Sequence, residues 1–142
     1  MRAFLLAASV TLIGQATVAS AQAPAQRGGI KLSDVAGTWD VKSMAGPKDS
    51  VVVASVVTST ADGKGWTMKL ANREPVPVRV VAVGGDSVVT EAGPYESVLR
   101  PGQKVTTRTV GHYKGDTMTG TIEARYASGD VIRLKTAGTR RK

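Results

Sequence analysis

Few residues of this chain are of the types that carry out chemistry. The sequence contains one histidine, His112, and no cysteine, so zinc sites built from several histidines or from thiolates are excluded. To act as a general base, His112 would have to lie beside a nucleophile and be oriented by an acid. The strand register expected for this region turns His112 outward, opposite Thr119, with no acid adjacent. We therefore expect a surface imidazole and predict no catalytic residue and no enzymatic activity.

The remaining candidates for chemistry are carboxylates and glycine-rich turns. Glu91 and Glu96 flank Ala92-Gly93-Pro94-Tyr95 and could share a cation or an acid/base task, but carboxylates beside turns are more often solvated. Gly84-Gly85-Asp86 lies between two strands, which is the wrong context for a phosphate loop. Asp62-Gly63-Lys64-Gly65 lacks the alternating oxygen ligands of a calcium loop. We expect no metal ion and no cofactor.

The elements that would position these residues are strands. Short Val/Thr-rich segments separated by Gly, Pro and Asp recur along the chain, a pattern typical of an all-β sandwich or barrel. Segments 86–92 and 95–100 are either two strands or one strand interrupted at Gly93-Pro94, which gives nine strands or eight. The predicted strands are 37–44, 51–61, 65–70, 77–83, 86–92, 95–100, 104–114, 116–126 and 130–137.

Turn chemistry predicts the register of the C-terminal third. A two-residue turn at Gly115-Asp116 pairs Lys114 with Thr117, and a three-residue loop at 127–129, with Gly129 left-handed, begins the last strand. Period-2 alternation then places one apolar and one polar face on each strand. The predicted cross-strand neighbours are Tyr113 with Met118, Gly111 with Gly120, Thr109 with Ile122, Val105 with Tyr126, Arg108 with Glu123, Ala124 with Ile132, Ile122 with Leu134, and Glu123 with Arg133.

Consecutive hairpins make neighbours of consecutive strands. An open sheet of eight or nine such strands would leave two long unpaired edges, and closure removes them. The predicted fold is an up-and-down antiparallel meander closed into a barrel, with a β-sandwich as the alternative.

The N-terminal stretch has the pattern of an export signal. Arg2, an apolar run to Val18 and the small residues Ala19-Ser20-Ala21 predict a signal peptide at 1–21, cleaved after Ala21 or, as second choice, after Ala23. Polar residues interrupt the run before it reaches the ~18 apolar residues of a spanning helix. The expected domains are the signal peptide, a flexible leader at 22–31 and one barrel domain at 32–142, with a helical turn near 31–36 capped by Ser33.

The formal net charge is +8 at pH 7. No basic run is interleaved with aromatic residues, so we expect no nucleic-acid partner. This excess of positive charge fits a slightly basic exported protein, which we expect to be periplasmic or extracellular. The alternative is a non-catalytic envelope module that binds anionic lipid or polysaccharide surfaces through its basic face and its C-terminal Arg140-Arg141-Lys142.

Three short motifs carry a resemblance to a known family. They are Gly37-Thr38-Trp39, the run from Gly115 to Thr121 (Gly-Asp-Thr-Met-Thr-Gly-Thr) and Gly138-Thr139-Arg140. Over about residues 32–141 the chain resembles small exported bacterial lipocalin-like, or calycin-type, barrels of unassigned function. The resemblance implies structural roles for Gly37 and Trp39, with Trp39 at the closed end and an arginine, Arg140 or Arg125, across its ring.

A barrel of about eight strands either holds one small ligand or fills its interior with side chains. The predicted inward residues are mostly small and apolar, including Val78, Val80 and Ala82. The resemblance implies a monomer that binds a small apolar or amphipathic molecule non-covalently. The expected ligand-lining residues are Trp66, Met68, Tyr95, Thr107, Thr109, Tyr113 and Met118.

Overall fold

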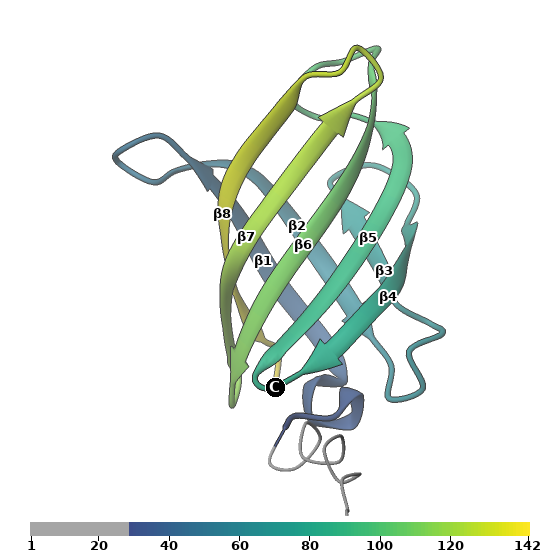
Figure 1. Cartoon of the computed structure of the whole chain (residues 1–142), viewed down its shortest axis with the longest axis vertical. Helices are drawn as coiled ribbons and strands as arrows, with labels where there is room; N and C mark the ends of the chain where they lie inside the picture. The colour runs from purple at the N-terminus through teal and green to yellow at the C-terminus, as the bar shows by residue number, and fades with distance from the viewer. Residues whose placement is uncertain (1–28) are drawn as a thin grey trace, which may run out of the picture.

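The computed structural model describes residues 29–142, so the predicted signal peptide, its cleavage site and most of the predicted leader lie outside the described residues. A short 3₁₀ helix precedes eight strands (Figure 1). The elements are η3 (Leu32–Val35), β1 (Gly37–Ala45), β2 (Ser50–Ser59), β3 (Thr67–Leu70), β4 (Val76–Gly84), β5 (Ser87–Glu96), β6 (Lys104–Lys114), β7 (Thr117–Tyr126) and β8 (Val131–Arg140). Among these elements no helix is long and apolar enough to cross a membrane.

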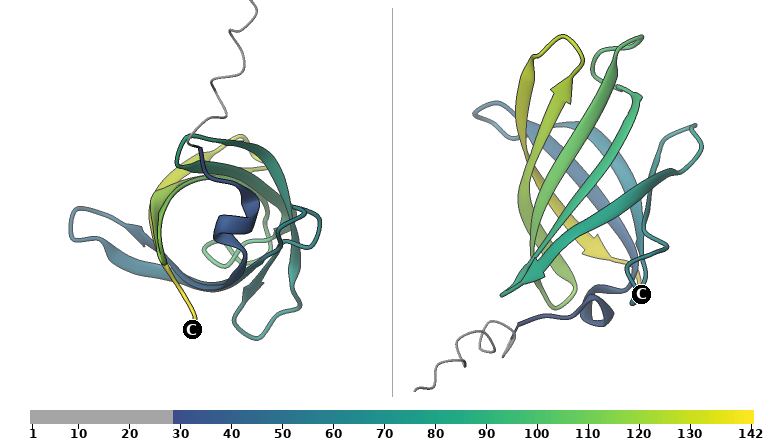
Figure 2. Two further views of the ribbon diagram at one scale, coloured as in Figure 1. Left: turned by 90° about the horizontal axis from the view of Figure 1, so that it is seen from below. Right: turned by 45° about the vertical axis from the view of Figure 1, so that its right-hand side comes forward.

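Each strand pairs antiparallel with the next, and β1 pairs with β8 to close the barrel (Figures 1 and 2). The predicted up-and-down barrel is therefore confirmed, and the sandwich alternative is not the fold. β5 continues through Gly93-Pro94, with a register irregularity between Ala92 and Tyr95. The predicted segment 86–92 and the first two residues of the predicted segment 95–100 are thus one strand, which gives eight strands rather than nine. Residues 97–100 lie beyond its end at Glu96, so the prediction of strand there is wrong.

The predicted register of the β6–β7 and β7–β8 pairs is confirmed. Tyr113 lies opposite Met118 and Thr109 opposite Ile122, as the Gly115-Asp116 turn requires. Gly129 has a φ of +100° and donates its N–H to the carbonyl of Tyr126, which is the left-handed turn residue expected there.

One strand departs from simple alternation. The β4–β5 ladder shifts register between Val80 and Ala82, so Val81 is an extra residue on β4 and is 47% exposed. Val80 packs against the core, whereas Ala82 is exposed. The prediction that Ala82 faces inward is therefore wrong, because a β-bulge reverses the facing of every residue that follows it.

Residues before β1 close the lower end of the barrel. Ile30 donates its N–H to the carbonyl of Gly85 at 2.8 Å and packs against the core, so it belongs to the barrel rather than to the leader. Seen from below in Figure 2, η3 lies across the opening. Ser33 lies inside η3, and the helix is capped instead by the Asp34 carboxylate, which accepts the N–H of Lys31 at 2.8 Å.

A cluster of buried hydrophobic residues begins at Val35 of η3 and includes Trp39 and Met118. Trp39 is 2% exposed and donates its indole N–H to the carbonyl of Val35 at 2.9 Å. The ring of Tyr113 meets it edge-on, with 5.1 Å between centroids. Little space is left for a side chain at Gly111, because a Cβ on it would lie 3.2 Å from Cε1 of Tyr113 and 3.3 Å from Cγ of Met118. The glycine thus leaves room for a layer of large side chains that forms the barrel floor.

Candidate ligand-binding cavity

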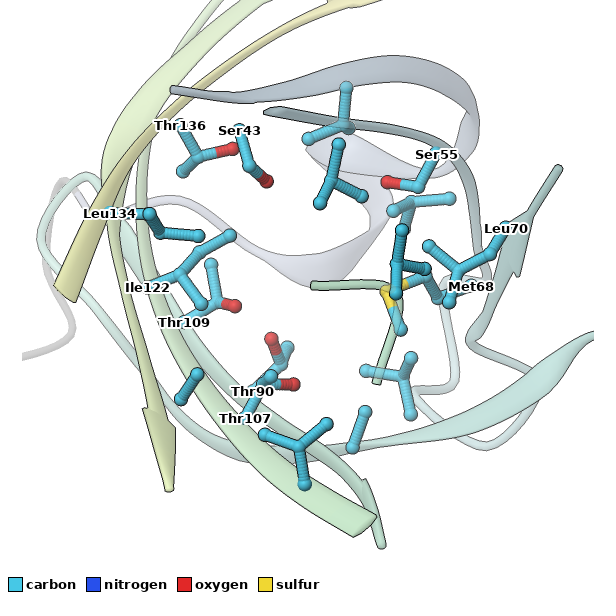
Figure 3. Close-up of a pocket in the computed structure, with 18 of the residues that line it drawn as sticks. Ser43, Ser55, Met68, Leu70, Thr90, Thr107, Thr109, Ile122, Leu134 and Thr136 are labelled. Carbon is cyan, nitrogen blue, oxygen red and sulfur yellow. The ribbon is translucent and has the colours of Figure 1, made fainter. Parts of the chain in front are cut away.

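A cavity of about 100 Å³ lies inside the barrel above this floor (Figure 3). Trp39, Trp66 and Met118 line its lower part, and the strands of the barrel form its wall. The fold brings together at this one cavity every residue predicted to line a ligand site, namely Trp66, Met68, Tyr95, Thr107, Thr109, Tyr113 and Met118.

The cavity wall is apolar and uncharged. None of the lining residues carries a carboxylate, ammonium or guanidinium group. An ion placed here would lose its hydration without gaining a counter-charge, which costs far more than burying a neutral group. The apolar part of the wall consists of Val41, Val53, Val57, Leu70, Val78, Ala92, Val98, Leu99, Val105, Ile122, Ala124 and Leu134, besides the residues already named.

Serine and threonine hydroxyls interrupt this wall on several strands. Figure 3 shows Ser43 beside Thr136, Ser55 across the cavity from them, and Thr90, Thr107 and Thr109 on the β5–β6 side. Sequence reasoning named only the last two. Ser43 could have been found, because two-residue steps from Trp39 along β1 place it on the same face.

Tyr95 and Tyr113, which are half-buried, add neutral polar atoms to the wall. Burial raises the pKa of Tyr113 to about 12. Burial also raises the pKa of Tyr95, an effect partly offset by the neighbouring Thr107 hydroxyl. Both phenols are therefore protonated near neutral pH. They can donate a hydrogen bond to a ligand without placing a charge beside it.

The β5–β6 loop covers part of the upper end. Ser97, Val98 and Leu99 of this loop line the cavity. The Ser97 hydroxyl makes three hydrogen bonds in this loop. It lies 2.8 Å from the Tyr126 hydroxyl, and it accepts the backbone N–H groups of Leu99 at 3.1 Å and Arg100 at 3.0 Å. These bonds hold the loop against β7.

Arg100 ties the same loop to the neighbouring β7–β8 turn. Its guanidinium is 2.8 Å from the Asp130 carboxylate and lies over the Tyr126 ring, 4.5 Å from the centroid. The two turns that flank this side of the mouth are therefore linked to each other above the cavity.

The arginine across the Trp39 ring is Arg140, with Cζ 5.0 Å from the centroid. Arg125, the other candidate, bonds instead to Glu123 on the outer surface. Gly37 has a φ of +135°, and a Cβ there would lie 3.1 Å from Cδ of Arg140. The glycine of the Gly-x-Trp motif thus provides both the backbone conformation and the space that Arg140 occupies.

His112 has an acid beside it, contrary to the prediction from sequence. Its Nδ1 lies 3.0 Å from the Asp86 carboxylate and 3.0 Å from the Ser87 hydroxyl. The cluster is exposed, and both partners approach the same ring nitrogen. A nucleophile–base–acid relay needs the serine on one nitrogen and the acid on the other, so this arrangement does not activate Ser87. The hydrogen bond with His112 lowers the pKa of Asp86, and the hydrogen bond from the Ser87 hydroxyl lowers it further by a smaller amount.

The two carboxylates considered for acid/base work have structural partners. Glu91 pairs with Arg108 at 2.8 Å, and Glu96 accepts the backbone N–H of Gly102 at 3.0 Å. Within residues 29–142, no three histidine or acidic side chains cluster as metal ligands would.

The basic C-terminus folds onto the barrel. Arg141 donates two hydrogen bonds to the Asp40 carboxylate, at 3.0 and 2.8 Å, and Lys142 lies 3.6 Å from Asp116. Arg140 also bonds to Asp116 at 2.9 Å. Each of the three terminal cations therefore has a carboxylate beside it.

Comparisons with protein-family models, with curated proteins and with solved structures find no match for this chain. The class of protein is therefore defined by the fold and the site alone. It is a closed, eight-stranded, up-and-down antiparallel barrel with an uncharged internal cavity.

Proposed function

We propose that the protein is an exported, monomeric, lipocalin-like barrel that binds a small, uncharged, largely apolar molecule non-covalently in its interior. The observation that carries this proposal is a cavity whose lining residues are all apolar or neutral hydroxyl-bearing. Removing apolar surface from water drives such binding, and a few fixed hydroxyls orient the ligand.

The volume limits the buried part of the ligand. An engineered apolar cavity of roughly 150 Å³ in another protein binds benzene or xenon, and the cavity here is about 100 Å³. The enclosed group is accordingly about as large as a small ring or a short branched chain. A longer ligand would extend toward the mouth beside Val98 and Leu99, which are 39% and 36% exposed.

The alternative, a module that binds anionic surfaces through its C-terminal cations, has less support. Arg140, Arg141 and Lys142 each lie beside Asp40 or Asp116. Binding a phosphate or sulfate there would require separating those pairs.

Native mass spectrometry of protein purified from its own host tests the proposal. We expect a population heavier than the bare chain by the mass of one small neutral molecule, released by collisional activation or by organic solvent. A mass equal to that of the bare processed chain, with no adduct after incubation with apolar compounds, would contradict the proposal.

Tryptophan fluorescence gives a second readout. Trp39 and Trp66 both line the cavity, so a ligand in contact with the floor should change their emission. Binding in an uncharged cavity should be insensitive to salt, whereas binding to surface cations should weaken steeply as salt is added.

A further inference from the structure

The Ser43 hydroxyl is a buried polar group that lacks a partner within the described chain. Ser43 is 5% exposed and lines the cavity, and Figure 3 shows its oxygen on the cavity side. No hydrogen bond joins its Oγ to any other residue of 29–142. Buried hydroxyls nearly always have a partner, because leaving one unsatisfied forfeits its bonds to water. Because the Ser43 oxygen lies on the cavity side, a group inside the cavity is positioned to supply the missing partner.

Thr136 lies next to Ser43 on β8, as its register partner. It is 2% exposed, and its hydroxyl donates to the carbonyl of Lys42 at 3.1 Å. Since its only proton is used in that bond, the Thr136 oxygen can offer an incoming group only its lone pairs. Ser43 has a free proton and free lone pairs.

A ligand group that uses the free proton of Ser43 and the lone pairs of Thr136 accepts a hydrogen bond from Ser43 and donates one to Thr136. An alcohol hydroxyl does both, a carbonyl only accepts, and a hydrocarbon does neither. Carboxylates and ammonium groups are disfavoured because no lining residue carries a compensating charge. Leu134 and Ile122 lie beside the pair in Figure 3 and provide apolar wall for the rest of the molecule.

We propose that Ser43 and Thr136 form a polar subsite that binds the hydroxyl group of an uncharged, otherwise apolar alcohol. This inference rests on the proposed function, and it adds the chemical class of the ligand and the position of its oxygen.

Cyclohexanol and methylcyclohexane, which match in shape but differ in the hydroxyl, provide the test. Their affinities are measured by titration of tryptophan emission for the wild type, Ser43→Ala and the control Thr119→Ala, which removes an exposed hydroxyl on β7 that does not line the cavity. We expect Ser43→Ala to weaken cyclohexanol binding roughly three- to tenfold, the contribution of one neutral hydrogen bond, and to leave methylcyclohexane within about twofold. Thr119→Ala should leave both affinities within about twofold.

The outcomes separate the two proposals. If both compounds bind the wild type but Ser43→Ala changes their affinities equally, or changes neither, the subsite is overturned and the proposed ligand-binding function stands. If neither compound binds, the proposed function fails, and the subsite fails with it.

The ligand-free protein supplies an independent measurement. Because Ser43 makes no bond within the described residues, Ser43→Ala should leave the midpoint of urea unfolding unchanged or raise it. Thr136→Val should lower it, because the bond to the Lys42 carbonyl is lost. A lowered midpoint for Ser43→Ala would show that Ser43 has a partner in the protein and would overturn the subsite.

Discussion

The guanidinium of Arg140 lies over the indole ring of Trp39, with Cζ 5.0 Å from the ring centroid. The same side chain donates to the carbonyls of Ala36 at 2.9 Å and Asp34 at 3.0 Å, and to the Asp116 carboxylate at 2.9 Å. One residue at the end of β8 thereby ties together η3, the start of β1 and the β6–β7 turn. The floor of the cavity depends on this junction.

Replacing Arg140 should therefore destabilise the barrel. Arg140→Ala removes the stacking contact and leaves three carbonyls, those of Asp34, Ala36 and Gly115, short of a donor. We expect a loss of about 2–3 kcal/mol in the free energy of unfolding. Urea denaturation measures it. The neighbouring Arg141→Ala is the control, because its pair with Asp40 is exposed and should contribute little. Equal effects of the two substitutions would contradict the role given to Arg140.

Gly120 has no room for a side chain. A Cβ on Gly120 would lie 1.9 Å from the carbonyl oxygen of Val110, so Gly120→Ala must displace the backbone of β6 or β7. We expect a destabilisation of at least ~3 kcal/mol or failure to fold. Gly84→Ala is the control, since a Cβ there meets nothing within 4 Å. A Gly120→Ala protein as stable as Gly84→Ala would show that the two strands are less closely apposed than described.

Alkaline pH should weaken the barrel through Tyr113. Burial raises the pKa of this phenol to about 12, from an ordinary value of 10.0. Above the ordinary value the unfolded chain releases the proton while the folded chain retains it, so stability is lost as pH rises from 10.0 toward about 12. Urea midpoints across that range should fall less steeply for Tyr113→Phe. If the urea midpoints of the wild type and Tyr113→Phe fell equally steeply with pH, the raised pKa of Tyr113 would not be the cause of the loss.

Ser97 should control the β5–β6 loop. Ser97→Ala removes the hydroxyl bonded to Tyr126 and to the backbone N–H groups of Leu99 and Arg100. We expect a loss of roughly 1–3 kcal/mol and faster amide hydrogen exchange at Leu99 and Arg100. The control Ser128→Ala alters a serine in the adjacent turn whose bond to Asp130 is long, at 3.5 Å. Unchanged exchange at both amides would show that the Ser97 hydroxyl does not hold the loop in place.

The parts of the fold that sequence reasoning predicted correctly depend on short-range signals. The Gly115-Asp116 turn has two residues, so the pairing of Tyr113 with Met118 follows from it by counting. The same alternation brought Thr107 and Thr109 to the cavity wall. The residues that form a tight turn and the alternation of side chains between the two faces of a strand are local properties, so they can be predicted directly from residue types.

The parts that were missed depend on structure that no local pattern encodes. The bulge at Val81 turned Ala82 outward, although both residues are apolar like the residues on either side of them. The contact between His112 and Asp86 required the β5–β6 register, which spans a loop without a defined turn type. Ser43 and Thr136 meet through closure of β1 on β8, at opposite ends of the described chain.

Xenon binding tests the central claim, an accessible apolar cavity inside the barrel, most directly. Crystals of the wild type and of Ala92→Leu, which extends a buried side chain into the cavity, are exposed to xenon under pressure, and the anomalous signal is mapped. Xenon occupies dry apolar cavities, so we predict a site among the cavity-lining residues of the wild type that is lost or greatly reduced in Ala92→Leu. A wild-type barrel with no xenon inside, its interior filled by its own side chains, would contradict the account.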